Sequence, residues 1–379
     1  MKIGIDCRTI LNPVEGERGG IGHYTYYLVK TIIESDKKNQ YALYFDWRVK
    51  DTREFERPNV EIKHFPFSQY NSYLPFAYSH MLIAAYLMKE SLDVYHSPVA
   101  SLPFTYPKKS VITVHDLAMY KNPSWYPSQI ITSKLLVPQS LRKADKIIAV
   151  SESTKRDLKS IFNINAKKIA VIHEGAVVDK IPVKNKKIDS ISKYQLGNGF
   201  FLFIGTLAPR KNVVTLVRAY KKLLEWDSEF SAYPLVIAGS KDFRHEDVFN
   251  TIKELKITKQ VKYLGYVTHN QKIELLKKAT AFVFPSLYEG FGLPVLEAMT
   301  CGTPVITSRA SSLPEVAGRA ALLVDPLKEL EIAKAMRRLL ENTDLRKRLE
   351  TLGYAQAKKF SWQSCAAQTI QVYQSLSKK

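Results

Sequence analysis

The sequence predicts an α/β protein made of two doubly wound domains, each with a parallel sheet covered by helices. The chain has 379 residues, which exceeds the roughly 250 residues at which a single hydrophobic core stops growing. Short β-branched or aromatic runs alternate with longer segments of helical periodicity, and several runs are apolar on both faces. Strands of that kind are typical of parallel sheets with helices on both sides.

The expected strands fall into two sets. In the first half we expect strands at Lys2–Asp6, Tyr41–Phe45, Val60–His64, Asp93–His96, Val111–Val114, Lys146–Val150 and Ile169–His173. In the second half we expect strands at Phe200–Gly205, Pro234–Gly239, Val261–Leu264, Ala281–Pro285, Thr303–Thr307 and Ala321–Val324. Between the sets, the polar and charged stretch 183–190 has no apolar period and predicts a linker. Two such domains would face each other across a cleft, with functional motifs just after strands.

The charge of the chain indicates an anionic partner. There are 56 basic and 36 acidic residues, for a net charge of +20. Nucleic acid, an anionic membrane surface and phosphorylated substrates would all fit this balance. Positive charge is in excess in both halves of the sequence rather than concentrated in one arm, which disfavours nucleic-acid binding.

The N-terminus and the cysteines bear on compartment and on metal binding. No stretch reads as the about 20 uninterrupted apolar residues of a membrane span. Asp6 and Arg8 stand where a signal peptide would need an apolar core, so we expect a cytoplasmic protein. Cys7, Cys301 and Cys365 are far apart and form no CxxC pair, which disfavours a zinc ribbon or a disulfide framework.

A glycine-rich loop follows the first strand. Gly16–Gly22 leads into a helix expected at Tyr24–Ile33. Successive glycines let backbone N–H groups approach an anion, and the start of a helix adds a partial positive charge. The spacing is not GxGxxG, so a dinucleotide site is weakly indicated, and a merely flexible loop is the alternative.

His115 follows a strand directly. The segment Val111–Val114 ends in His115-Asp116, which would bring the histidine to the ligand-binding edge of the sheet. A lone histidine is more often structural, but this position favours a substrate contact.

Two cations follow the first strand of the second set. Arg210 and Lys211 lie between the strand Phe200–Gly205 and an amphipathic helix. A pair of cations beside a helix start can clamp a diphosphate, and the alternative is a solvated pair of charges.

The most informative segment is Phe284–Met299. Glu289 lies in the loop after a strand, and Glu297 lies eight residues on, within the next helix. Gly290 and Gly292 free the backbone at the start of that helix, so that its N–H groups can meet phosphate or sugar oxygens. Carboxylates are natural acceptors for sugar and ribose hydroxyls.

Glu289-Gly-Phe-Gly-Leu-Pro-Val-Leu-Glu297 resembles the E-x7-E motif of retaining GT-B glycosyltransferases, and specifically glycosyltransferase family 4. The resemblance covers nearly the whole chain. Its other segments occur in the expected order: Gly20–Tyr24, Val114–Leu117, Val150–Thr154, Gly205 with Pro209–Asn212, and Leu313–Val316. Phe360–Trp362 and the helix after it resemble the segment that crosses back to the N-terminal domain.

This resemblance implies a GT-B fold and a division of the chain. Residues 1–182 would form a Rossmann-like acceptor-binding domain and 183–193 the linker. Residues 194–358 would form a Rossmann-like nucleotide-sugar-binding domain, and 359–379 the helix that returns to the first domain.

The resemblance also implies roles for individual residues. Glu297 would hold the ribose hydroxyls, and Glu289 would contact the transferred sugar. Arg210 and Lys211 would neutralise the departing diphosphate. The remaining contacts would be the backbone of Phe291, Gly292 and Leu293 at sugar and phosphate, Gly20 at the phosphate, His115 near the sugar, and Tyr266 and Val267 at the base.

The implied chemistry is transfer with retention by a front-face mechanism, in which the leaving diphosphate helps to take the acceptor proton. No Asp-x-Asp motif occurs in the sequence, so we expect a metal-independent enzyme without a cofactor. Many relatives have an arginine where Thr206 follows Gly205 here, which shifts the phosphate role to Arg210 and Lys211. The Pro-Arg-Lys-Asn, His-Asp and Leu-Pro-Glu-Val segments most resemble the mannosyltransferase branch of bacterial surface polysaccharide synthesis. GDP-mannose is the expected donor, with UDP-sugars as the alternative.

The segment Phe65–Met88 is dense in aromatic and aliphatic residues. A core helix with its entry loop would explain it, and so would a surface that dips into lipid beside a basic domain. A lipid-linked glycan acceptor would make peripheral association with the inner face of the cytoplasmic membrane useful. A nucleotide-sugar epimerase of the same fold and a basic nucleic-acid-binding protein are the remaining alternatives.

Overall fold

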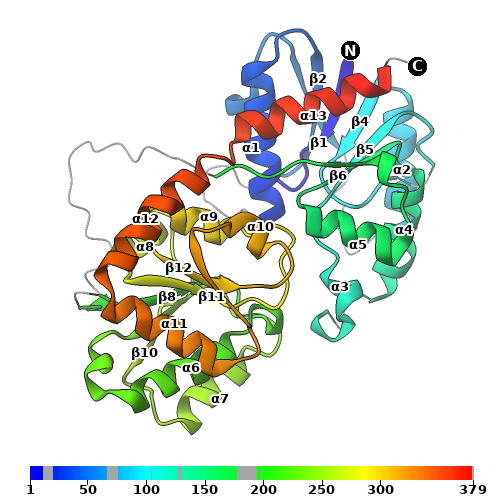
Figure 1. Ribbon diagram of the computed structural model, residues 1–379. Helices are drawn as coiled ribbons and strands as arrows, with labels where there is room; N and C mark the ends of the chain where they lie inside the picture. The colour runs from blue at the N-terminus through cyan, green and yellow to red at the C-terminus, as the bar shows by residue number, and fades with distance from the viewer. Residues whose placement is uncertain are drawn as a thin grey trace. The chain divides into compact units, whose positions relative to one another are not determined.

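The computed structural model describes residues 1–11, 20–65, 76–103, 105–126, 130–176, 194–197 and 199–377. Two compact units make up the chain, Met1–Gly175 with Ser361–Lys379 as unit 1 and Ala176–Phe360 as unit 2 (Figure 1). The predicted linker 183–193 lies outside the described residues.

Unit 1 is built on a 7-stranded sheet in the order β3-β2-β1-β4-β5-β6-β7. Every neighbouring pair is parallel. The strands are β1 (Lys2–Asp6), β2 (Gln40–Asp46), β3 (Val60–Phe65), β4 (Val94–Ser97), β5 (Ser110–Val114), β6 (Lys146–Ala149) and β7 (Ile169–Val171). The main helices are α1 (Gly20–Ser35), α2 (Phe76–Met88), α3 (Ala118–Lys121), α4 (Ile130–Lys143), α5 (Glu152–Phe162) and α13 (Trp362–Ser377). The strand order reverses between β1 and β4, which is where a doubly wound sheet opens a ligand crevice.

Helix α13 belongs to unit 1 and packs beside α1 (Figure 1). The hydroxyl of Tyr373 on α13 lies 2.6 Å from Nδ1 of His96 on β4, and Nε2 of His96 lies 2.9 Å from Oγ1 of Thr113 on β5. At Gly175 a Cβ atom would lie 2.3 Å from the backbone nitrogen of Trp362, so only glycine allows the two segments to approach this closely.

Unit 2 is built on a 6-stranded sheet in the order β10-β9-β8-β11-β12-β13, again with parallel pairs throughout. The strands are β8 (Phe201–Ile204), β9 (Leu235–Ala238), β10 (Val261–Tyr263), β11 (Ala281–Phe284), β12 (Val305–Ser308) and β13 (Ala321–Val324). The helices are α6 (Val213–Trp226), α7 (Glu246–Glu254), α8 (His269–Lys278), α9 (Leu293–Thr300), α10 (Leu313–Ala317), α11 (Glu329–Glu341) and α12 (Thr343–Ala357). Here the order reverses between β8 and β11. Phe201 of β8 pairs with Leu235 of β9 on one side and with Ala281 of β11 on the other.

The prediction of two doubly wound α/β domains is confirmed, and every expected strand is present with ends that differ by at most about two residues. The predicted start of the first helix was wrong. Helix α1 begins at Gly20 rather than at Tyr24, so Gly20 and Gly22 belong to its first turn and not to a loop. Gly22, Tyr26, Val29 and Ile33 are buried at helical spacing, and this continuous buried face carries the helix back to the glycines.

Candidate active site

The predicted motifs of unit 2 meet at the carboxyl ends of β8 and β11. After β8 the chain makes a short 3-10 turn at Pro209–Lys211 and enters α6 through Asn212. After β11 it forms the loop from Pro285 to Gly292 and enters α9. Because β8 and β11 are the neighbours between which the strand order reverses, both loops lie where open α/β sheets bind ligands.

Arg210, Lys211 and Glu289 form one charged cluster at this edge. The Lys211 ammonium donates to Oε1 of Glu289 over 2.6 Å, and Nη1 of Arg210 lies 3.0 Å from Oε2 of the same carboxylate. Arg210 also donates to the backbone carbonyl of Tyr288 over 3.2 Å. Sequence reasoning named all three residues, and the fold brings their side chains into contact.

The cluster is buried, and this sets its ionisation. Lys211 is 8% exposed and Glu289 is 7% exposed. Burial alone would raise the pKa of Glu289, but the charges of Lys211 and Arg210 outweigh it and lower the pKa to about 2. Glu289 is therefore a carboxylate at neutral pH, and it carries one negative charge beside two positive ones.

A set of serines supports the Glu289 loop, and sequence reasoning missed it. The Ser286 hydroxyl donates to Oε1 of Glu289 over 2.6 Å, and the Ser308 hydroxyl donates to the carbonyl of Ser286 over 2.5 Å. The backbone N–H of Glu289 donates to Oγ of Ser311 over 2.8 Å, and the Ser312 hydroxyl donates to the carbonyl of Phe291 over 2.5 Å. Ser308 is the last residue of β12, and Ser311 and Ser312 lie in the turn after it; nothing in their local sequence marks them as part of a site.

The start of α9 has the backbone geometry that the glycines predicted. Gly292 is its N-cap residue with φ of 127°, and a proline stands in the first turn. A side chain at Gly292 would be strained by this φ and would come within 3.0 Å of Leu313. Leu293 begins the helix, and Gly290 and Phe291 precede it, so the backbone named in the prediction forms one continuous turn into α9.

Glu297 lies in α9, as predicted, and its carboxylate forms an ion pair with Lys272 of α8. The sequence offered no signal for this partner, because the two residues come from different helices. Among the described residues, Glu297 and Glu289 share no ion-pair partner, so Glu297 lies outside the Glu289 cluster.

Tyr266 and Val267 lie in the loop between β10 and α8. Tyr266 is 65% exposed, whereas Val267 is buried. Gly265, just before them, has φ of 70°, a left-handed conformation that lets the chain turn out of the sheet at this point.

His115 and Gly20 belong to unit 1. Gly20 is the first residue of α1 and is exposed. Nε2 of His115 lies 2.9 Å from the carbonyl oxygen of Pro98, and Nδ1 lies 3.2 Å from Oε1 of Glu174. Both ring nitrogens therefore face oxygen atoms of unit 1. Within unit 1 the ring is thus held by structural hydrogen bonds, and its predicted substrate contact stays a prediction.

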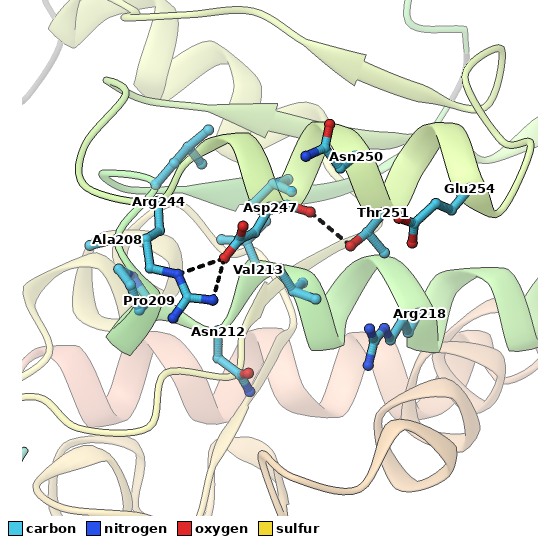
Figure 2. Close-up of a pocket in the computed structure, with 13 residues that line it drawn as sticks. Ala208, Pro209, Asn212, Val213, Arg218, Arg244, Asp247, Asn250, Thr251 and Glu254 are labelled. Atoms are coloured by element: carbon cyan, nitrogen blue, oxygen red, sulfur yellow. Dashed lines mark hydrogen bonds and ion pairs between the residues drawn. The ribbon is translucent and has the colours of Figure 1, made fainter. Parts of the chain in front are cut away.

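A pocket of about 430 Å³ borders the same turn that carries Arg210 and Lys211 (Figure 2). It lies between the first half of α6 and the length of α7, and its lining includes Pro209 and Asn212, which flank the two cations. Arg244 reaches along its wall to Asp247, with Nε 2.8 Å from Oδ2. None of the predicted site residues lines this pocket, so it is separate from the charged cluster.

Two further features concern the described part of the chain. None of its helices has the length and apolar character needed to cross a bilayer.

Cys7, Cys301 and Cys365 are free, and burial raises the pKa of the Cys301 thiol to about 11.

Each of the two units matches a family model of glycosyltransferases. Residues 18–180 match the family model described as Glycosyltransferase Family 4, and residues 184–356 match the one described as Glycosyl transferases group 1. The O-antigen chain mannosyltransferase B of Escherichia coli is 32% identical over 380 residues, which span 96% of this chain and 98% of that protein.

Solved structures share the fold at low identity. The sucrose-phosphate synthase of Thermosynechococcus elongatus has a TM-score of 0.76 at 20% identity, over 99% of this chain and 98% of that one. The Anabaena protein Alr3699/HepE, in its complex with UDP-glucose, has a TM-score of 0.73 at 18% identity, over 99% of this chain and all of that one (100%).

Proposed function

The chain belongs to glycosyltransferase family 4 of the GT-B fold, and on this premise we propose that it transfers mannose from GDP-mannose to a glycan acceptor. The proposed process is the synthesis of a bacterial surface polysaccharide. The sugar and the process are proposed from the O-antigen chain mannosyltransferase B, to which the chain is similar over 96% of its length.

The observation that carries the proposal is the cluster of Arg210, Lys211 and Glu289. Transfer from a nucleotide sugar requires stabilisation of the negative charge that develops on the leaving diphosphate. Two cations held at a strand-to-helix turn, in a largely dry setting, supply such stabilisation without reorganising during the reaction. The start of α9 adds oriented backbone N–H groups at the neighbouring loop.

We assign the steps of the transfer as follows. Arg210 and Lys211 bind the diphosphate, and Glu289 accepts a hydrogen bond from the transferred sugar. The acceptor hydroxyl oxygen bonds to the anomeric carbon on the face from which the diphosphate departs, while the bond from that carbon to the phosphate oxygen breaks. Because attack and departure take place on the same face, configuration is retained. The acceptor proton passes to the departing phosphate, so no separate base is needed.

The donor nucleoside is proposed to lie along Tyr266 and Val267, with its ribose at Glu297. Both elements belong to unit 2, as does the cluster that would bind the diphosphate. The roles implied for Gly20 and His115 of unit 1 stay predictions.

Membrane association is proposed for unit 1. On α2, Met81 is 56% exposed, Leu82 37% and Met88 45%, whereas Ile83 and Leu87 pack into the core. Helix α2 therefore has a core face and an exposed apolar face, and residues 66–75 of the predicted lipid-facing segment lie outside the described residues. An apolar face on a protein of net charge +20 would favour anionic bilayers. Co-flotation with anionic liposomes at low salt is expected, and a protein that stays in solution would overturn this part.

The experiment that tests the function is donor-dependent transfer in the presence of EDTA. The protein is incubated with GDP-mannose, UDP-glucose or UDP-galactose and a lipid-linked glycan acceptor, and nucleoside diphosphate release is followed. Release from GDP-mannose that rises with acceptor is expected. Selective turnover of a UDP-sugar would keep the transferase and overturn mannose. Conversion of donor to another nucleotide sugar without acceptor would indicate an epimerase.

Thermal unfolding with GDP, UDP and ADP gives an independent readout. A nucleotide at about 100 times its Kd stabilises the folded protein by roughly 2.7 kcal/mol. We expect GDP to raise the Tm, and the Arg210→Ala/Lys211→Ala variant to lose the shift. Lys253→Ala, an exposed lysine of α7, is the matched control and should keep it.

A further inference from the structure

Lys272 of α8 and Glu297 of α9 form a partly buried ion pair, with side chains 19% and 13% exposed. The Lys272 ammonium donates to Oε1 of Glu297. Among the residues that the structure describes, none donates a hydrogen bond to Oε2. One oxygen of the carboxylate is therefore held by the protein, and the other keeps its acceptor capacity.

The position of Lys272 follows from how α8 begins. Thr268 and Gln271 form a capping box, in which the backbone N–H of Gln271 donates to Oγ1 of Thr268 and that of Thr268 donates to Oε1 of Gln271. The backbone N–H of Lys272 then donates to the Thr268 carbonyl over 2.9 Å. This cap sets the first turn of α8 and directs the Lys272 side chain towards α9.

The cap also ties Lys272 to the preceding loop. Tyr266 and Val267 come directly before Thr268, so the loop enters α8 through the capping box. Through Lys272 the end of this loop is linked to Glu297 by one rigid helix turn and one ion pair.

We propose that Lys272 is a positioning residue for the donor ribose. It holds Glu297 at Oε1 so that Oε2 faces the ribose hydroxyls of the nucleotide sugar. This inference rests on the proposed function, because it takes Glu297 as the acceptor for the ribose and the Tyr266–Val267 loop as the place of the base.

The physical reason is preorganisation. A glutamate side chain has several rotamers, and a ribose hydroxyl must select one of them on binding. A charge-assisted hydrogen bond from Lys272 to Oε1 selects that rotamer in advance. Without the lysine, the donor would bind more weakly, while the reacting atoms at the diphosphate would be unchanged.

The test is a comparison of ribonucleotides with their 2′-deoxy forms. GDP, 2′-deoxy-GDP, UDP and 2′-deoxy-UDP are titrated calorimetrically into the wild type, Lys272→Met, Lys272→Arg and Lys277→Met. Lys277, exposed on the same helix, is the matched control. For the nucleotide that binds, we expect the wild type to prefer the ribo form by about tenfold.

In Lys272→Met the ribo form should lose about fivefold in affinity and the deoxy form much less, so that the preference shrinks. Lys272→Arg and Lys277→Met should keep the preference. In kinetics, Lys272→Met should raise the donor KM and leave kcat near the wild-type value, because the interaction is not with the reacting centre.

A double-mutant cycle shows whether Lys272 acts through Glu297. In the Glu297→Gln background, Lys272→Met should have no further effect on the ribo-to-deoxy ratio. An equal effect in both backgrounds would overturn the proposal.

The outcomes separate this inference from the function on which it rests. Failure of the wild type to bind any of the four nucleotides would overturn the donor site itself. Binding with a ribose preference that Lys272→Met leaves intact, even if the variant has a lower Tm, would overturn the inference alone and leave a purely structural ion pair.

Discussion

Nζ of Lys211 and Oε1 of Glu289 lie 2.6 Å apart although 78 positions separate the two residues in the chain. The contact exists because β8 and β11 are neighbours in the sheet, so that the loops after these strands meet. Burial strengthens the attraction, since little water screens it.

Replacing Lys211 by alanine should reduce turnover at least tenfold, which corresponds to about 1.4 kcal/mol in the activation barrier. The reason is the loss of one of two cations at the leaving diphosphate. Steady-state kinetics with a saturating donor measures the effect, and Lys253→Ala serves as the surface control. Near-normal kinetics in Lys211→Ala would remove this residue from the site.

Glu289→Gln should bind the nucleoside diphosphate product more tightly, by about tenfold, while transfer falls. The substitution keeps the shape of the side chain and removes the negative charge beside Arg210 and Lys211. The cluster that a diphosphate meets is then more positively charged. Calorimetric titration with GDP and UDP measures it. Ser286→Ala, which leaves the charges unchanged, should bind product about as the wild type does; weaker product binding in Glu289→Gln would contradict the argument.

The stability of unit 2 should fall with acid below about pH 4.5 because of Glu289. Its pKa is lowered from 4.5 to about 2 in the folded protein, so its contribution is fully present above the unfolded value and is lost as pH falls towards 2. The shift corresponds to about 3 kcal/mol. Urea unfolding between pH 5 and pH 3 should show a smaller loss in Glu289→Gln than in the wild type; equal slopes would show that Glu289 is not the group responsible.

The stability of unit 1 should depend on the protonation of His96. Burial lowers the pKa of His96 from 6.5 to about 3, so the unfolded chain takes up a proton at a pH where the folded chain does not. Stability therefore falls as pH decreases from about 6.5 towards 3. Chemical unfolding monitored across this range, with histidine NMR signals as a direct readout, tests it; a His96 that titrates near 6.5 in the folded protein would disprove it.

Tyr373→Phe should destabilise the protein by about 1–3 kcal/mol, because Nδ1 of the buried His96 loses its hydrogen-bond partner on α13. The hydroxyl is the only atom removed, so packing is retained. A Tm lowered by several degrees is expected, and Tyr354→Phe, whose side chain is 42% exposed, is the control. Equal Tm values for the two variants would mean that the hydrogen bond contributes nothing.

The local sequence determined the elements and the placement of the motifs. Runs such as Phe201–Ile204 and Ala281–Phe284 are short and apolar on both faces, which is typical of parallel strands covered by helices, so the strands could be predicted. The polar residues that follow them, Arg210, Lys211 and Glu289, could be placed at strand ends for the same reason. The start of α1 was missed because glycine reads as a loop, whereas the buried helix face outweighs that preference.

What only the tertiary structure decided is which groups share an environment. Periodicity shows that a strand is buried but not which strand lies beside it, so the contact of Lys211 with Glu289 depended on the order β8-β11. The hydrogen bonds of Ser308 and Ser311 to the Glu289 loop and the pairing of Lys272 with Glu297 also join different elements. Hydrogen bonds and ion pairs act over a few ångströms in space, and the folded chain, not the spacing of residues along it, sets those distances.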